Sequence, residues 1–236
     1  MISFVGIRTD RTVMNTKIKD FVTANKLNLF LMLYFVPYMI WFEILEHTVT
    51  DNFHVIHMSI DDKIPFCEYF IIPYYMWFGY VASAFIYLVI IDSSEYRKMC
   101  LYLYTGMTLF LIISTIYPNG AYLRPDVFEN DNIFTDLVKR IYSIDTQTNL
   151  FPSIHVYNSI GVHIAVARAT RGRRERKPIV ILSFIIAASI TISTVFVKQH
   201  SMFDVITAVA LNIIMYLLVY ARNDKETAVV NTVREG

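Results

Sequence analysis

Six long apolar segments constrain this chain more than any other feature of its sequence. They lie near residues 27–45, 69–91, 99–118, 151–168, 178–197 and 203–221. A helix needs about 17 to 25 mostly apolar residues to cross ~30 Å of hydrocarbon. The composition agrees, because 55% of the residues are hydrophobic and the mean hydropathy is +0.44, which is too apolar for one water-soluble core. We therefore expect an all-α polytopic membrane protein in which six transmembrane helices form a bundle.

Basic residues are divided unequally between alternate loops. The N-terminal segment, the 92–98 loop, the 168–177 loop and the C-terminal tail hold 16 of the 21 Lys and Arg residues, and the other loops hold five. The positive-inside rule then predicts that both termini are cytoplasmic. Residues 1–26 mix charged and apolar positions with no cleavage site, so we expect the first span to be retained. The predicted parts are a cytoplasmic segment 1–26, a membrane domain 27–221 and a cytoplasmic tail 222–236.

Six of these cations fall within residues 168–177. Such a cluster could bind nucleic acid, but beside two membrane spans it is more typical of a topology anchor on anionic lipid. The sequence also has no GxGxxG motif and no P-loop. The membrane is therefore an expected partner, and nucleic acid is not.

The stretch Phe151-Pro152-Ser153-Ile154-His155 opens the fourth predicted span. Proline is well suited to the first position of a helix, so Ser153 and His155 are predicted in the first turn. Free N–H groups and the positive end of the helix dipole make such a start a ready anion site. A phosphate-bearing substrate is the first interpretation.

His200 and Asp204 stand four residues apart at the start of the sixth span. On one helix they would share a face, so that the carboxylate accepts the Nδ1 proton and Nε2 is left as a nucleophile or general base. An H-x3-D pair alone is more often an interfacial hydrogen bond. A catalytic role for this pair is nevertheless favoured, because Arg124 and His155 come from other parts of the chain and are predicted at the same outer rim.

The remaining histidines carry weaker signals. His54 and His57 in the first outer loop are three apart and could form a metal pair, but no third ligand is near in sequence, and an interfacial loop is the alternative. His163 lies in the middle of the fourth span, where we expect a packed, hydrogen-bonded role.

A short amphipathic helix is predicted between the third and fourth spans. Phe134, Leu137, Val138 and Ile141 have the i, i+3, i+4, i+7 spacing, and Asn132 is a plausible cap. This helix is expected either to roof the site or to be a solvated connector.

Taken together, the polar clusters resemble the three motifs of the type 2 phosphatidic acid phosphatase superfamily. The family pattern is Lys-x6-Arg-Pro, Pro-Ser-Gly-His and Ser-Arg-x5-His-x3-Asp. The form Phe-Pro-Ser-Ile-His, with Thr194 after Ser193, is more similar to the branch that contains inositol phosphorylceramide synthases. The matching residues are Arg124, Pro125, Pro152, Ser153, His155, Ser193, His200 and Asp204.

Three positions depart from the family pattern. Tyr117, Ile154 and Thr194 stand where the family has Lys, Gly and Arg. Lys198 lies four residues after Thr194, so if the fifth span stays helical its ammonium reaches the place of the family's guanidinium. The alternative is an interfacial Lys198 that extends to the lipid headgroups.

The resemblance implies a mechanism and a site. His200 would attack phosphorus to form a phosphohistidine, Asp204 would orient it, and His155 would protonate the leaving oxygen and later activate the acceptor. Arg124, Ser153 and backbone N–H groups would hold the phosphoryl oxygens, with Lys198 as a further candidate, and no metal or other cofactor is implied.

The expected activity is that of a lipid phosphatase, or of a phosphotransferase that passes a phosphate-bearing headgroup between lipids. The expected location is a bacterial cell membrane, with the site facing outside and a lipid phosphate as substrate. A non-catalytic anion-binding or transport protein that retains the fold is the alternative.

Overall fold

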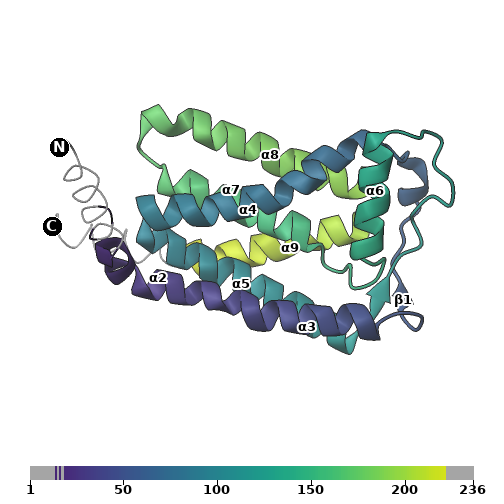
Figure 1. Ribbon diagram of the computed structural model, residues 1–236, viewed down its shortest axis with the longest axis horizontal. Helices are drawn as coiled ribbons and strands as arrows, with labels where there is room; N and C mark the ends of the chain where they lie inside the picture. Colours follow the sequence, from purple (N-terminus) through teal and green to yellow (C-terminus); the bar gives the residue numbers. More distant parts are fainter. Residues whose placement is uncertain (1–13, 15, 17–18, 222–236) are drawn as a thin grey trace, which may run out of the picture.

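The computed structural model describes residues 14, 16 and 19–221 and consists mainly of helices (Figure 1). The predicted tail 222–236 and most of residues 1–18 lie outside the described part. The elements in chain order are α2 (Lys26–Leu31), a 3₁₀ turn (Met32–Tyr34), α3 (Phe35–Thr48), β1 (His54–Val55), 3₁₀ turns (Asp61–Lys63 and Glu68–Phe70), α4 (Ile71–Ile91), α5 (Ser93–Ile116), β2 (Asn119–Gly120), α6 (Ile133–Ile144), α7 (Ile154–Ala169), a 3₁₀ turn (Arg174–Arg176), α8 (Lys177–Phe196), α9 (Met202–Tyr216) and a π-helical turn (Leu217–Ala221).

Five helical stretches in the described residues are long and apolar enough to cross a membrane. They are Lys26–Thr48, Glu68–Ile91, Ser93–Ile116, Arg174–Phe196 and Met202–Ala221. Their lengths and compositions are consistent with an all-α integral membrane protein. The predicted fourth span corresponds to α7, which has only 16 residues and a length of about 24 Å. A count of six spans is therefore not established.

The helix starts differ from the sequence prediction at two places. Pro152 does not occupy the first position of α7, because Ser153 is the N-cap and the helix begins at Ile154. The third span begins earlier than predicted, at Ser93, because the Asp92 side chain accepts hydrogen bonds from the N–H groups of Ser94 and Glu95. Most of the expected 92–98 loop is thus the first turns of α5.

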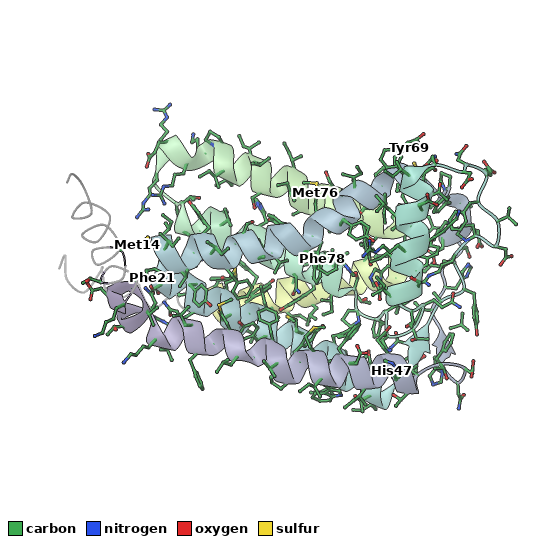
Figure 2. The ribbon with its side chains drawn as sticks, in the orientation of Figure 1. Met14, Phe21, His47, Tyr69, Met76 and Phe78 are labelled. Atoms are coloured by element: carbon green, nitrogen blue, oxygen red, sulfur yellow. The ribbon has the colours of Figure 1, made fainter. Side chains whose placement is uncertain are left out.

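Helix α7 lies at the centre of the bundle, in contact with α4, α5, α8 and α9. Val156, Tyr157 and Val162 are fully buried on it. The approach to α5 is close, since a Cβ added at Gly106 would overlap the ring of Tyr157. The surrounding helices expose apolar side chains instead, and Figure 2 labels Met76 and Phe78 on α4, which are 43% and 52% exposed. The short helix is buried by protein, and the long helices present the surface suited to lipid.

Helix α6 lies across one end of the bundle, nearly at right angles to the other helices (Figure 1). The predicted cap is confirmed, because the Asn132 side chain accepts from the N–H groups of Phe134 and Thr135. Val138 is fully buried in a cluster with Ile71 and Val197. The amphipathic pattern thus marks a helix that roofs the bundle, and the alternative of a solvated connector is wrong.

A small parallel pairing of β1 and β2 organises the same end of the molecule. His54 is in register with Asn119 and Val55 with Gly120, and a bridge joins Gly120 to Thr148. Three loops are therefore fastened together beside the start of α7.

Candidate active site

His200 and Asp204 come together at the start of α9, but not as two residues of one helix. His200 lies in the turn before the N-cap Ser201, and Asp204 is at the third helical position, where its Oδ2 accepts from the Ser201 N–H at 2.9 Å. His200 Nδ1 lies 3.4 Å from Asp204 Oδ2. The expected contact is thus made by a capping turn, and the helical-face argument for it was wrong.

This pair is buried and incompletely hydrogen-bonded. His200 is 6% exposed and Asp204 is fully buried. Within residues 19–221, His200 Nδ1 and Asp204 Oδ1 have no well-aligned hydrogen-bond partner. Buried polar atoms without partners are costly, so their presence in this turn favours a functional role over a purely structural one.

His155 meets His200 across the interface between α7 and the α8–α9 turn. His155 Nδ1 and His200 Nε2 are 3.3 Å apart. The His155 ring is packed against the rings of Tyr74 and Trp77, with centroids 4.6 and 4.5 Å away. Two imidazoles separated by 45 residues in sequence therefore meet at the end of the bundle that α6 covers.

Burial favours the neutral form of the His200 imidazole. The imidazole is removed from water and lies near the Arg124 cation, and these effects lower its pKa to about 3, although a hydrogen bond with the Leu150 backbone acts in the opposite direction. His200 is consequently neutral near pH 7. A neutral imidazole retains a nitrogen lone pair, as nucleophilic attack on phosphorus requires.

Ser153 links the start of α7 to the start of α9. Its Oγ caps α7 by accepting from the Val156 N–H at 3.4 Å, and its own N–H donates to the Asp204 carbonyl at 3.3 Å. In the described chain, the N–H groups of Ile154 and His155 have no hydrogen-bond acceptor. These amides lie at the helix N-terminus where the sequence analysis expected an anion-binding element.

Arg124 reaches the site but is already engaged by protein acceptors. Its Nε and Nη2 donate to Gln199 Oε1 at 3.1 and 2.6 Å, and its guanidinium also donates to the carbonyls of Tyr142, Asp145 and Thr146. A guanidinium has five N–H donors, and these bonds leave one free. Arg124 therefore joins the end of α6 to the residue before His200. Its free N–H can make one contact with a phosphate, whereas a bidentate contact requires exchange of at least one acceptor.

Lys198 does not lie beside Thr194 as the sequence analysis expected. Helix α8 ends at Phe196 and Lys198 has a φ of 54°, so the helical extension that would have placed Lys198 beside Thr194 is wrong. The Lys198 ammonium donates to the carbonyls of Asp61 and Ile64 at 2.7 and 2.5 Å. It anchors the loop between α3 and α4, and phosphate binding by Lys198 stays a prediction that would require these bonds to break.

Asp61 supports the candidate site, and the sequence analysis did not identify this role. The carboxylate is 3% exposed and accepts from Ser201 Oγ at 2.6 Å, from the Met202 N–H at 2.8 Å and from the Met58 N–H at 2.8 Å. It thus holds the loop between α3 and α4 against the start of α9, next to His200. No local pattern signals this contact, because the partners are 140 residues apart.

Asn119 is a second residue that the sequence analysis missed. Its Oδ1 accepts from the N–H groups of Leu150 and Phe151 at 2.8 and 2.9 Å, and it is fully buried. The side chain thereby fixes the loop that leads into Ser153 and His155. A Pro-Asn-Gly sequence is typical of a turn, but it does not indicate which loop the Asn119 side chain contacts.

Asp145 completes the polar layer beneath α6. Its Oδ2 accepts from Tyr74 Oη at 2.9 Å and from Gln199 Nε2 at 3.2 Å. Burial and the neighbouring Glu46 carboxylate raise the pKa of Asp145 to about 6, and its hydrogen bond with Tyr74 and the Arg124 cation oppose the shift. Asp145 therefore holds Gln199 and Arg124 in place beside His200.

The other histidines lie apart from this cluster. His54 stacks on Tyr117 with centroids 4.1 Å apart, and His57 Nε2 pairs with Asp62 Oδ1 at 2.8 Å, so the two do not converge on one point. His163 Nδ1 lies 3.3 Å from Ser183 Oγ, which agrees with the expected hydrogen-bonded role.

Arg124, Ser153, His155, His200 and Asp204 thus lie at one end of the bundle, joined by the contacts described above. Comparison with protein families then gives one finding. Residues 121–228 match the PAP2 superfamily.

The PAP2 match spans all five of these residues and covers a little under half of the chain. No curated protein and no solved structure matches the chain. Since the PAP2 superfamily generally comprises phosphatases and phosphotransferases, the match together with the apolar helices indicates a lipid phosphatase-type function. It does not distinguish the branch that contains inositol phosphorylceramide synthases.

Proposed function

We propose that this protein is an integral membrane lipid phosphatase or headgroup phosphotransferase that acts through a phosphohistidine. The observation that carries the proposal is the part-buried contact of His155 with His200, which lies beside Asp204 and the free N–H groups at the start of α7. The spacing of these groups supports two-step transfer, because a nucleophile and a proton donor face one position.

In the first step, the lone pair on His200 Nε2 attacks phosphorus. The bond from phosphorus to the lipid oxygen breaks, and that oxygen takes a proton from protonated His155. Asp204 stabilises the charge that develops on the His200 ring. In the second step, His155 accepts a proton from water or an alcohol, whose oxygen attacks phosphorus and releases His200.

The present contact is too close for this reaction to begin. A reacting phosphorus must lie about 3 to 3.5 Å from Nε2, and His155 Nδ1 now lies at 3.3 Å. Substrate must therefore enter between the two imidazoles and displace His155 within its aromatic surroundings. The Ser153 hydroxyl, the N–H groups of Ile154 and His155, and Arg124 after exchange of an acceptor would then hold the phosphoryl oxygens.

The proposed arrangement in the membrane has six spans and cytoplasmic termini. It counts α7 as a span, because this helix runs through the middle of the bundle although it is short. The unequal distribution of basic residues supports an outward-facing site at the end roofed by α6. A site in this position would act on lipid phosphates of the outer leaflet.

One observation favours the non-catalytic alternative, in which the fold binds or transports an anion without chemistry. Arg124 has four of its five donors occupied by protein acceptors. The distinguishing experiment incubates purified protein with phosphatidate, a polyprenyl diphosphate and an inositol-phosphoryl headgroup donor, with and without an alcohol acceptor. Phosphate release and product lipids separate hydrolysis from transfer, and binding without turnover supports the alternative.

The His200→Ala variant tests the phosphohistidine, and the His163→Ala variant is the matched control. We expect His200→Ala to lose turnover and acid-labile covalent phosphate, and His163→Ala to retain both. Wild-type rates in His200→Ala would exclude the proposed mechanism.

The role of His155 is tested with substrates that differ in leaving group. A good leaving group needs little protonation, so a nitrophenyl phosphate should partly rescue His155→Ala and should not rescue His200→Ala. An equal loss of rate with good and poor leaving groups would contradict the proton-donor role.

A further inference from the structure

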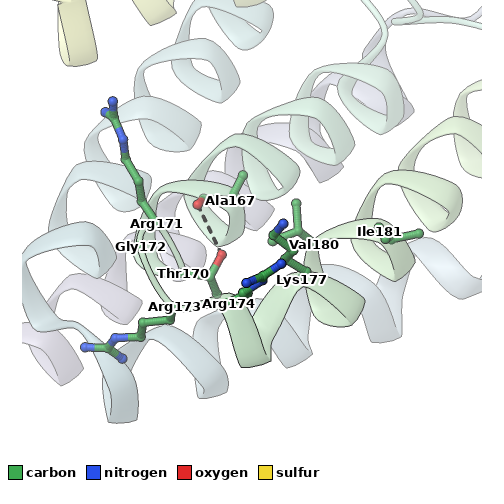
Figure 3. A pocket seen from close by; sticks show the side chains of 9 residues that line it. All are labelled: Ala167, Thr170, Arg171, Gly172, Arg173, Arg174, Lys177, Val180 and Ile181. Carbon is green, nitrogen blue, oxygen red and sulfur yellow. Dashed lines mark hydrogen bonds between the residues drawn. The ribbon is translucent and has the colours of Figure 1, made fainter.

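A second candidate binding region lies at the end of the bundle opposite to His155 and His200. A cavity of about 450 Å³ opens at the turn between α7 and α8 (Figure 3). Its lining comes from the last turns of α7, the connecting turn and the first turns of α8. Gly172, with a φ of +80°, provides the left-handed residue that this turn requires.

The polar side of the cavity is strongly cationic. Arg171, Arg173, Arg174 and Lys177 line it, and all four are exposed. Across the described chain, none of these four side chains has an ion-pair or hydrogen-bond partner. Glu175 is the only acidic residue between positions 167 and 181. Among the described residues, no carboxylate neutralises this local positive charge.

The other side of the cavity is apolar. Ala167, Val180 and Ile181 contribute to it, and Ile181 is 60% exposed. The apolar stretch that contains α8 and is long enough to cross a membrane begins at Arg174, so the cations lie at the start of this stretch. Ile181 lies about 6 Å further along the helix than Lys177. A ligand that fits both sides carries negative charge at the boundary and hydrocarbon below it.

We propose that this cavity binds one anionic phospholipid. Arg171 and Arg173 extend in different directions from the turn in Figure 3, but all four cationic side chains are exposed and can turn toward one phosphodiester, whose oxygens guanidinium groups can bind in a bidentate manner. The upper part of an acyl chain lies against Val180 and Ile181. This site is independent of the catalytic proposal, because it is at the opposite end of α7 and shares no residue with it. It differs from a diffuse attraction of a basic loop in having a shaped cavity and one ligand.

The test measures binding of phosphatidylglycerol to the full-length protein in detergent by native mass spectrometry. The expected result is saturable binding of one lipid, with phosphatidylcholine at least tenfold weaker. The double variant Arg173→Gln/Arg174→Gln should bind phosphatidylglycerol at least tenfold less tightly. The matched control, Lys139→Gln/Arg140→Gln, removes the same charge from exposed positions on α6 and should bind as the wild type does.

A third variant separates a cavity from general electrostatic attraction. Ala167→Leu fills the cavity and leaves every cation in place, so it should also weaken binding about tenfold. Unsaturable binding, equal losses in the two double variants, or unchanged binding in Ala167→Leu would each overturn the proposal. Since the readout is lipid binding, its failure is distinguishable from failure of the proposed enzyme activity.

Discussion

The Asp61 carboxylate is expected to be essential for the stability of the turn that carries His200. The Asp61→Ala variant removes an acceptor from three donors, which are Ser201 Oγ at 2.6 Å and the N–H groups of Met202 and Met58 at 2.8 Å each. A buried donor left without an acceptor costs about 1 to 3 kcal/mol. Water can reach some of these donors after the substitution, so we expect a total loss of about 3 to 5 kcal/mol, in the lower part of the range for three such donors.

The neighbouring Asp62 offers a matched control. Asp62 carries the same charge, but its side chain is 69% exposed and bonds only to His57 Nε2 among the described residues. An exposed pair of this kind contributes about 0 to 1 kcal/mol. Asp62→Ala should therefore unfold at nearly the wild-type temperature, whereas Asp61→Ala should unfold roughly 6 to 20 °C lower.

The assay follows thermal unfolding of the detergent-purified variants by tryptophan fluorescence, and then phosphate release well below both unfolding temperatures. Asp61→Ala should also lower kcat, because the Ser201 turn that orients His200 loses its support. Asp61→Asn keeps one acceptor oxygen and should recover part of both losses. If Asp61→Ala and Asp62→Ala unfold within 2 °C of each other, the structural role assigned to Asp61 is wrong.

Three further predictions concern charge and topology. Burial lowers the pKa of His200 in the folded state to about 3. As the pH falls below about 6.5, His200 therefore binds a proton in the unfolded state but not in the folded state. The free energy of unfolding should consequently decline by about 2 kcal/mol between pH 7.5 and pH 5. The His200→Gln variant should lack this contribution, and identical pH profiles of unfolding temperature would refute it. Lys198→Met should lower the unfolding temperature through its two lost carbonyl bonds, whereas a loss confined to kcat/KM, with stability unchanged, would return Lys198 to the phosphate site. In a background without native cysteines, Arg173→Cys should react with an impermeant reagent only after the membrane is opened, and Asn130→Cys should react in intact cells; the reverse pattern would contradict an outward-facing site.

The sequence alone predicted the features that depend on local periodicity and composition. Apolar segments long enough to span a membrane predicted most of the helices, because backbone groups in hydrocarbon must be bonded within the segment. The spacing of Phe134, Leu137, Val138 and Ile141, with Asn132 before them, predicted α6 and its cap, because both signals lie within a few turns of one helix.

Motif spacing also predicted the members of the candidate site, and here local reasoning reached its limit. His155 and His200 were expected to share the outer rim, but their 3.3 Å contact depends on how α7 packs against the α8–α9 turn. The position predicted for Lys198 was wrong because α8 ends at Phe196, and beyond that end the Lys198 ammonium donates to carbonyls of the loop between α3 and α4.

Only the tertiary structure decided which polar groups support the site. Asp61 and Asn119 meet partners 140 and 31 residues away, and Arg124 binds Gln199 at a separation of 75 residues. These contacts depend on the folded paths of three loops at the end beneath α6, where no repeating pattern constrains the sequence. Apolar periodicity determines which segments are helical, since burial acts on each segment separately, whereas the pairing of buried polar groups depends on the complete packing of the bundle.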